Sequence, residues 1–361
     1  MLLNTPIKVL VVDDSLVFGR FLTSNLPKAN SRIQIVGYAA NAYEAIEKIP
    51  QCAPDVITMD VEMPKMNGIE FLKQVMPKHP IPVILVSAVN MNVFEALSNG
   101  AVDFVKKPNP AANFGRQEFV ESLASKIIIA SRSKVRVAGP SSVKKEPLSP
   151  IVPRLSPINP AKLNSMIIAI GASTGGTEAT LQILQALPEN IPGIVITQHM
   201  PEGFTKMYAE RLNRLCRLHV KEACTGDKIE RGTVLIAPGS LHMKVVRLGS
   251  SYTVNCFSSD KVNGHRPSVD VLFRSVADVA KSDAVGIILT GMGHDGADGL
   301  LKMRRAGAYT IGQDKDSCVV YGMPMVAHNI GAVNVQASCA NIPRVLTNLS
   351  LIHISEPTRP Y

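Results

Sequence analysis

A proline-rich basic segment at residues 131–165 divides the chain and limits what it can fold into. The segment contains six prolines, and its seven basic residues against one acidic residue carry six of the chain's nine net positive charges. A stretch of this composition cannot build a hydrophobic core and is typical of an extended linker. The 361-residue chain is therefore predicted to form two domains, at residues 1–130 and 166–352, with a polar frayed tail at 353–361.

Most of the chain's net charge of +9 lies in this segment. A solvated linker is sufficient to explain this concentration of basic residues. The alternative is a nucleic-acid-binding tail, which is disfavoured because aromatic residues are not interleaved with the basic ones. We therefore expect no nucleic-acid partner.

Other features of the chain bear on its compartment. No apolar run reaches the roughly 18 residues needed to cross a bilayer, so we expect no membrane insertion. The N-terminal MLLNTPIKVLVVDDS lacks a basic region and a cleavage site and is interpreted as a first strand rather than a signal peptide. The six cysteines have no metal-ligand spacing, which argues against structural zinc and a disulfide framework. These features predict a soluble cytoplasmic protein.

Short β-branched runs alternate with amphipathic stretches in both halves, which predicts parallel α/β sheets. In the first half the alternation favours a flavodoxin-like, doubly wound, five-stranded parallel sheet. Its apolar runs lie at 7–12, 32–38, 55–59, 82–87 and 102–106. The second half is predicted to hold a mainly parallel sheet with buried strands at 166–170, 193–197, 233–237 and 284–290. Runs at 242–248 and 252–256 suggest a hairpin, which would make this sheet mixed.

Polar side chains follow several strands of the first half where each strand ends. Asp13 and Asp14 follow the first strand and Asp60 the third, while Ser87 and Lys107 follow the fourth and fifth. Ligand sites of parallel sheets lie at this edge. Clustered carboxylates repel one another unless a cation neutralises them, and their oxygens suit Mg²⁺. The alternative, that Asp13 and Asp14 only cap the first helix, leaves the other three positions unexplained.

Residues 7–128 resemble a response-regulator receiver domain in the Asp13–Asp14 pair, in Asp60 followed by Val-Glu-Met-Pro, and in Ser87 and Lys107-Pro108. The resemblance implies that Asp60 accepts a phosphoryl group. It implies that Asp14, Asp60 and the Glu62 carbonyl bind Mg²⁺ directly, with Asp13 acting through water. Ser87 and Lys107 would contact the phosphate.

A glycine-rich turn, GASTGG at 171–176, follows the first strand of the second half and opens a helical stretch. The order strand–GxSxG–helix is the context of a nucleophile elbow, with Ser173 as the nucleophile. Glycine-rich turns before helices also cradle phosphates. The motif alone leaves a hydrolase and a phosphate-binding loop equally open.

Two further strand ends favour the hydrolase. His199 follows the strand at 193–197 and Asp295 follows the strand at 284–290. An imidazole can take the serine proton, and a carboxylate can orient the imidazole. Three other histidines are less suited to this role. His294 adjoins Asp295 and is a poor partner for it, His242 falls in a strand and is interpreted as structural, and His265 is expected to contact substrate or cap the next helix.

Residues 166–350 resemble the catalytic domain of the CheB family of chemotaxis protein-glutamate methylesterases. The matching runs are IGASTGGTEA, QHMPEGFT, IAPG, HRPSVDVLF, ILTGMGHDGADG and YGMP. The resemblance implies that Ser173 is the nucleophile, His199 the base and Asp295 its orienter. It also implies that the Met292 backbone N–H is the oxyanion donor, with Thr174 beside the nucleophile, and that the esterase site needs no cofactor.

The resemblance also implies partners and regulation. The substrates would be glutamyl methyl esters of methyl-accepting chemoreceptors, and in some members glutamines. The phosphodonor would be a chemotaxis histidine kinase, and the unphosphorylated receiver would block the esterase. Two other classes of protein are disfavoured. The intact Ser, His and Asp argue against a non-catalytic adaptor, and the absence of a basic recognition helix argues against a DNA-binding regulator.

Overall fold

A computed structural model describes residues 5–88, 92–108, 115–135 and 166–351. The chain divides into two compact units with the boundary between residues 139 and 140. Most of the predicted linker and all of the predicted 353–361 tail lie outside the described residues. Among the described residues, no helix combines the length and the apolar character needed to cross a bilayer.

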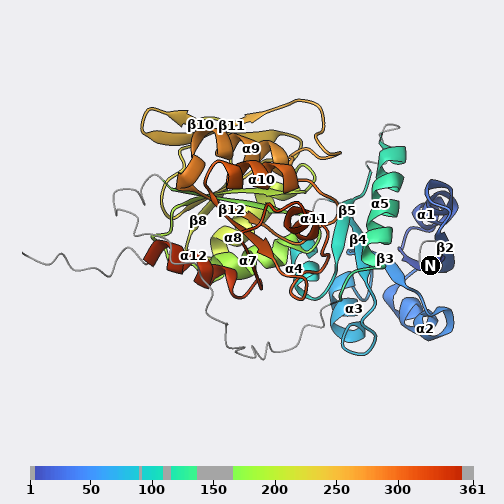
Figure 1. Cartoon of the computed structure of the whole chain (residues 1–361). Helices are drawn as coiled ribbons and strands as arrows, with labels where there is room; N and C mark the ends of the chain where they lie inside the picture. Colours follow the sequence, from blue (N-terminus) through green and yellow to red (C-terminus); the bar gives the residue numbers. More distant parts are fainter. Residues whose placement is uncertain (1–4, 89–91, 109–114, 136–165, 352–361) are drawn as a thin grey trace, which may run out of the picture. The chain divides into compact units, whose positions relative to one another are not determined.

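The first unit is built on a five-stranded sheet in the order β2-β1-β3-β4-β5, with every pair of neighbours parallel. This confirms the predicted flavodoxin-like, doubly wound sheet. The central strands are almost wholly buried because helices cover both faces (Figure 1). The strands are β1 (Ile7–Val12), β2 (Ile33–Ala39), β3 (Val56–Asp60), β4 (Val83–Ser87) and β5 (Asp103–Lys106). The helices are α1 (Leu16–Ala29), α2 (Ala42–Cys52), α3 (Gly68–Val75), α4 (Asn92–Ser98) and α5 (Arg116–Ala130).

The second unit is built on a seven-stranded sheet in the order β14-β13-β12-β6-β7-β9-β8. Every neighbouring pair in it is parallel. The strands are β6 (Ile167–Ala172), β7 (Gly193–Gln198), β8 (His219–Glu222), β9 (Thr233–Ile236), β12 (Ala284–Ile288), β13 (Tyr309–Gln313) and β14 (Val335–Ala337).

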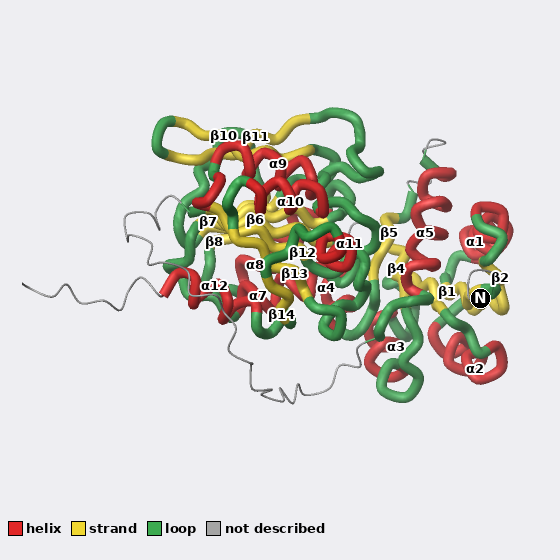
Figure 2. Tube along the Cα trace, viewed as in Figure 1, coloured by secondary structure: helices red, strands yellow, loops and turns green. Residues whose placement is uncertain are grey.

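The predicted hairpin exists but does not join this sheet. Strands β10 (His242–Leu248) and β11 (Ser251–Phe257) pair antiparallel as a separate two-stranded sheet, so the expectation of a mixed sheet is wrong. The hairpin turns its apolar side, including Met243 and Val254, onto helix α9 (Val269–Val279), and the three elements share one core. Burial of that side against the helix explains why the hairpin lies away from the main sheet (Figure 2).

Helices cover both faces of the second sheet, as expected for a parallel sheet. Figure 1 shows α9 and α10 on the face below the hairpin, and α7, α8 and α12 on the opposite face. The further elements are α7 (Gly176–Gln185), α8 (Phe204–Leu215), η1 (Lys281–Asp283), α10 (Ala297–Arg305), α11 (Met323–Asn329) and α12 (Ile342–Leu351).

In each of the two parallel sheets, there is one place where the chain stops adding strands on one side and starts adding them on the other. From β6 the chain adds β7, β8 and β9 on one side and later adds β12, β13 and β14 on the other. The reversal falls between β6 and β12 in the second unit, and between β1 and β3 in the first. Ligands of open α/β sheets bind outside the carboxyl ends of the strands at such points, so the topology marks one candidate site in each unit.

Candidate functional site

The carboxyl ends of β1 and β3 bring three carboxylates together. Asp13 and Asp14 follow β1, and Asp60 ends β3. One oxygen from each lies within 4.8 Å of the others. Ser15, rather than either aspartate, caps α1 by accepting a hydrogen bond from the Phe18 N–H at 3.3 Å. The helix-capping alternative is therefore wrong, and the clustered carboxylate oxygens are of the kind that suits a hard cation such as Mg²⁺.

Lys107 and Ser87 lie at the same edge of the first sheet. The Lys107 Nζ lies 2.8 Å from an oxygen of Asp13 and also pairs with Asp60. The Ser87 Oγ is buried and has no hydrogen-bond partner among the described residues. A buried hydroxyl without a partner costs free energy, so Ser87 is suited to an incoming polar ligand. Glu62 donates its backbone N–H to Asp60 at 3.2 Å.

The charged groups at this edge shift one another's pKa values. Burial raises the pKa of Asp60 and outweighs the opposing hydrogen bond and charge of Lys107. Burial also opposes the charged form of Lys107, but its hydrogen bonds to Asp13 and Asp60 hold the Lys107 pKa above its usual value. Lys107 therefore remains a cation beside Asp60.

In the second unit, Ser173 lies in the turn between β6 and α7. Its N–H donates to the Thr290 carbonyl at 3.0 Å, and its own carbonyl accepts from the Gly176 N–H at 2.7 Å. The Gln198 side chain donates to the same carbonyl at 2.9 Å. Helix α7 begins three residues after Ser173, so the strand–turn–helix context of a nucleophile elbow is present.

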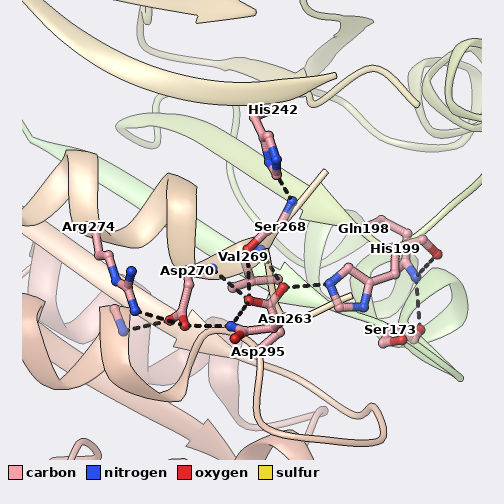
Figure 3. Close-up of polar contacts among 11 residues, drawn as sticks. Ser173, Gln198, His199, His242, Asn263, Ser268, Val269, Asp270, Arg274 and Asp295 are labelled. Atoms are coloured by element: carbon pink, nitrogen blue, oxygen red, sulfur yellow. Dashed lines mark hydrogen bonds and ion pairs between the residues drawn. The ribbon is translucent and has the colours of Figure 1, made fainter. Parts of the chain in front are cut away.

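His199 follows strand β7, which lies next to the strand that precedes Ser173. Strands β6 and β7 pair with Ala172 opposite Gln198, so the next residue of each strand, Ser173 and His199, emerges at the same edge. The His199 Nε2 lies 2.8 Å from the Asp295 Oδ2. The His199 Nδ1 is buried and has no hydrogen-bond partner among the residues that the structure describes. Figure 3 shows the ring with Asp295 on one side and Ser173 on the other.

The two ring nitrogens of His199 therefore have opposite surroundings. In the well-known Ser–His–Asp template, Nδ1 faces the carboxylate and Nε2 faces the serine. Here Nε2 faces Asp295, and Nδ1 is left for a proton donor on the side of Ser173. Since an ionised carboxylate only accepts hydrogen bonds, the neutral ring carries its proton on Nε2.

Asp295 lies in the loop between β12 and α10 and is 2% exposed. Besides His199, it accepts hydrogen bonds from the side chains of Asn263 and Ser268 and from the backbone N–H groups of Val269 and Asp270. Burial alone would raise the pKa of Asp295, but the hydrogen bond and charge of His199, with the hydrogen bonds of Asn263 and Ser268, hold it well below its usual range. Asp295 is therefore an anion at neutral pH.

The remaining predicted site residues lie around this centre. Thr174 is 4% exposed, and its carbonyl accepts a hydrogen bond from the Thr290 Oγ1 at 3.0 Å. Met292 is 39% exposed and follows Gly291 in the turn after β12. Its backbone N–H as oxyanion donor stays a prediction.

The other three candidate histidines have different environments. The His265 ring stacks on the His199 ring with centroids 3.7 Å apart and planes 10° apart. Ser268 is the N-cap position of α9, so His265 does not cap that helix, and substrate contact by His265 stays a prediction. His242 is fully buried, with its ring between the Asp260 carbonyl and the Ser268 N–H, in agreement with a structural role. His294 is exposed, and the imidazole that pairs with Asp295 is that of His199.

Three polar residues of this site, Asn263, Ser268 and Asp270, are assigned no role from the sequence. Asn263 and Ser268 contact Asp295 from a loop 27 to 32 positions earlier in the chain. Asp270 is fully buried, and burial raises its pKa, with the nearby charge of Asp295 adding to that effect. The run HRPSVDVLF contains two of the three, but only the folded loop shows that they converge on one carboxylate.

The two sites define the class of protein. One unit carries an acidic edge of the receiver type, and the other a Ser–His–Asp arrangement of the kind found in serine hydrolases. A model of the response regulator receiver domain matches residues 9–116, and a model of the CheB methylesterase matches residues 168–346.

The chain belongs to the CheB methylesterase family, with a receiver domain in front of the methylesterase domain, as the sequence motifs predicted. It is 49% identical to protein-glutamate methylesterase/protein-glutamine glutaminase 2 of Syntrophomonas wolfei, over 95% of this chain and 97% of the relative. It is 45% identical to the protein of the same activities from Syntrophotalea carbinolica, over 95% of this chain and 98% of the relative. The solved CheB methylesterase catalytic domain of Thermotoga maritima is 40% identical, with a TM-score of 0.50, and covers 51% of this chain and 98% of that one.

Proposed function

We propose that Ser173, His199 and Asp295 hydrolyse the γ-methyl esters of glutamate side chains on a protein substrate. The observation that carries this proposal is the orientation of His199, whose Nε2 binds Asp295 at 2.8 Å while its buried Nδ1 has no partner in the described structure. A base with one nitrogen held by an anion and the other without a partner is prepared to accept a proton, and Ser173 emerges at the same edge of the sheet.

The reaction follows from these positions. The Ser173 Oγ attacks the ester carbonyl carbon and passes its proton to the His199 Nδ1. The resulting imidazolium is stabilised by Asp295, whose low pKa keeps it ionised. His199 then gives this proton to the methoxide oxygen as its bond to the acyl carbon breaks, so that methanol leaves and the glutamyl acyl group stays on the Ser173 Oγ as an acyl-enzyme. In the second half of the reaction, His199 takes a proton from a water molecule as the water oxygen attacks the acyl carbon. The proton then passes to the Ser173 Oγ as its bond to the acyl carbon breaks, which restores Ser173 and releases the glutamate side chain.

The same site supports a second activity, hydrolysis of glutamine side chains. An amide differs from the ester in its leaving group, since His199 would give its proton to the departing amide nitrogen, which leaves as ammonia, instead of to the methoxide oxygen. The names of the relatives in Syntrophomonas wolfei and Syntrophotalea carbinolica include both activities. Ammonia release from glutamine-containing receptor peptides measures this activity separately.

Ester hydrolysis is tested with the full chain and a methylated receptor fragment. We expect Ser173→Ala to lower methanol release by several orders of magnitude, as loss of a nucleophile does. Ser251→Ala, at the exposed start of β11 in the hairpin, is the matched control and should be unaffected. Near-normal methanol release from pure Ser173→Ala protein would contradict the proposed nucleophile.

The acidic edge of the receiver unit supports phosphorylation at Asp60. Asp13, Asp14 and Asp60 supply clustered oxygens, and Mg²⁺, when bound there, would neutralise the charge of the carboxylates and of the phosphoryl oxygens. By the receiver likeness, the Glu62 carbonyl would complete the metal ligands. A carboxylate oxygen of Asp60 would attack the phosphorus, and the bond to the donor's leaving group would break. Lys107 and the unpartnered Ser87 hydroxyl are suited to the phosphoryl oxygens.

The partners follow from these two chemistries. A receiver domain implies a phosphodonor kinase, and a methylesterase of this family implies chemoreceptor substrates. We assign these roles to a chemotaxis histidine kinase and to methyl-accepting chemoreceptors, with the protein acting in the cytoplasm. Transfer of phosphate from a purified chemotaxis kinase to this chain, with Asp60→Asn as the negative control, tests the first assignment.

A further inference from the structure

One segment supplies most of the hydrogen bonds that hold Asp295. Residues 262–270 lead from the hairpin into the first turn of α9. From this segment the Ser268 Oγ donates to Asp295 at 2.8 Å and the Val269 N–H at 2.7 Å. The Asp270 N–H is a further donor at 3.2 Å. Asp295 therefore sits at the N-terminus of α9, where backbone donors and the helix dipole favour an anion.

A second buried carboxylate, that of Asp270, lies close to Asp295. Asp270 is 0% exposed and accepts the Gly299 N–H at 2.7 Å and a contact from Arg274 at 3.4 Å. Burial raises the pKa of Asp270, and the charge of Asp295 adds to that effect. Two buried carboxylates this close repel each other unless a donor lies between them.

Asn263 provides that donor. Its Nδ2 lies 2.8 Å from an oxygen of Asp270 and 2.9 Å from an oxygen of Asp295 (Figure 3). An amide group has two N–H donors, one for each carboxylate. Asn263 is an exposed residue, yet its amide group reaches two carboxylates that are themselves shielded from water.

Asn263 also has a simpler explanation that must be separated from this one. Val262 and His265 form an antiparallel bridge around Asn263-Gly264, and both central residues have positive φ, 54° and 79°. This is the arrangement of a two-residue turn, for which Asn-Gly, Asp-Gly and Gly-Gly are the favoured sequences. An Asn chosen only for the turn could be replaced by Asp or Gly without loss.

We propose that Asn263 is a positioning residue that bridges Asp270 and Asp295 and so keeps an oxygen of Asp295 directed at His199. The proposal rests on the proposed roles of Ser173, His199 and Asp295. Without the bridge, the two carboxylates repel, and Asp295 loses part of the fixed geometry that orients the imidazole. The same turn carries His265, which stacks on His199, so this turn contacts both the histidine and its carboxylate.

The pH dependence of such a site depends on every charge that faces it. Asp295 is faced by His199 from the end of β7 and by Asp270 from α9. The groups around these are Arg274 of α9, Asp298 of α10, His265 stacked on His199, His242 of β10 through Ser268, and the neighbouring His294. All of these residues are the same in the wild type and in a variant changed only at Asn263. A difference between their pH profiles therefore results from the substitution at Asn263.

Two variants keep the turn and remove the bridge. Asn263→Gly removes both donors, and Asn263→Asp replaces them with a third carboxylate. For Asn263→Gly we expect kcat for methanol release to fall about tenfold to a hundredfold with KM little changed, since hydrogen bonds to a charged group are lost. For Asn263→Asp we expect a larger deficit at alkaline pH. The deficit relative to wild type should shrink towards acid pH, where the introduced carboxyl group is protonated and can donate one hydrogen bond.

The controls distinguish the possible results. Lys281→Gly introduces glycine at another exposed position with positive φ, 49°, outside the site, and should match the wild type. If Ser173→Ala retains activity, the proposed nucleophile is wrong, whatever Asn263 does. If Ser173→Ala is inactive while both Asn263 variants keep wild-type kcat at every pH, the bridge has no positioning role and the inference is overturned. A rise in KM with unchanged kcat would overturn it as well, by making Asn263 a substrate contact.

Discussion

At the scale of single residues, Asp295 is the carboxylate on which the geometry of His199 depends. We expect Asp295→Asn to lower kcat about a thousandfold or more, because the amide cannot stabilise the imidazolium and can offer an N–H where an acceptor is needed. Asp298→Asn is the matched control, since Asp298 is 68% exposed and faces Arg274 rather than His199. A silent Asp295→Asn together with an inactive Asp270→Asn would mean that the other carboxylate orients the histidine.

The low pKa of Asp295 also predicts how the second unit responds to acid. Because the pKa is lowered in the folded protein, the ionised carboxylate stabilises the fold above its unfolded pKa of about 4. That contribution is lost as the pH falls through the folded pKa. Urea unfolding of wild type and Asp295→Asn should therefore show a stability difference that is largest near neutral pH and shrinks below about pH 4. A difference that is constant from about pH 7 to about pH 3 would contradict this.

At the scale of elements, the turn after β12 must leave room for Ser173. A Cβ on Gly291 would lie 2.6 Å from the Ser173 Cβ and 2.5 Å from the Met323 Sδ. We expect Gly291→Ala to displace Ser173 and lower kcat more than about tenfold. Gly249→Ala in the hairpin turn, with φ of 60° and open space around it, should cost about 1 kcal/mol of unfolding free energy and leave kcat unchanged. Equal activity of the two variants would contradict the steric argument.

Elements also explain how much could be predicted from the sequence. The placement of Ser173, His199 and Asp295 at one sheet edge could be predicted because each follows a buried apolar run, and the carboxyl ends of parallel strands converge there. Strands β8 and β14 each have only one buried residue, so neither forms a distinct apolar run in the sequence. The role of Asn263 could not be predicted, since its turn sequence explains its presence and only tertiary packing brings its amide to two carboxylates.

At the scale of the whole molecule, the receiver unit is expected to control the esterase through Asp60. We expect Asp60→Asn to abolish phosphorylation by a small phosphodonor with Mg²⁺ and to leave basal methanol release unchanged, because Asp60 lies in the other unit. Asp55→Asn, at an aspartate bound to the backbone of Lys8 at the opposite end of the sheet, is the control that should still accept phosphate. Stable phosphoryl incorporation into Asp60→Asn would refute the assignment of Asp60.

The composition of residues 131–165 predicts how this control can operate. A linker of the length and composition expected here would join two units without fixing their orientation and would keep each at a high effective concentration near the other. A weak inhibitory interaction is then sufficient. Phosphorylation adds negative charge beside Ser87 and Lys107, at the ends of β4 and β5. If that change weakens the inhibitory state by about 2.7 kcal/mol, the ratio of inhibited to active protein changes about 100-fold.

A fragment that begins near Ser165 therefore separates inhibition from recruitment. The second unit is compact and has its own hydrophobic core, as a fragment that folds by itself requires. We expect the fragment to release methanol faster than the unphosphorylated full chain and to ignore phosphodonor. Phosphodonor with Mg²⁺ should raise the full chain to the fragment's rate or beyond it, and Asp60→Asn should abolish that rise. If the fragment is no faster than the unphosphorylated full chain on a soluble methylated receptor peptide, the receiver only recruits the enzyme and does not inhibit it.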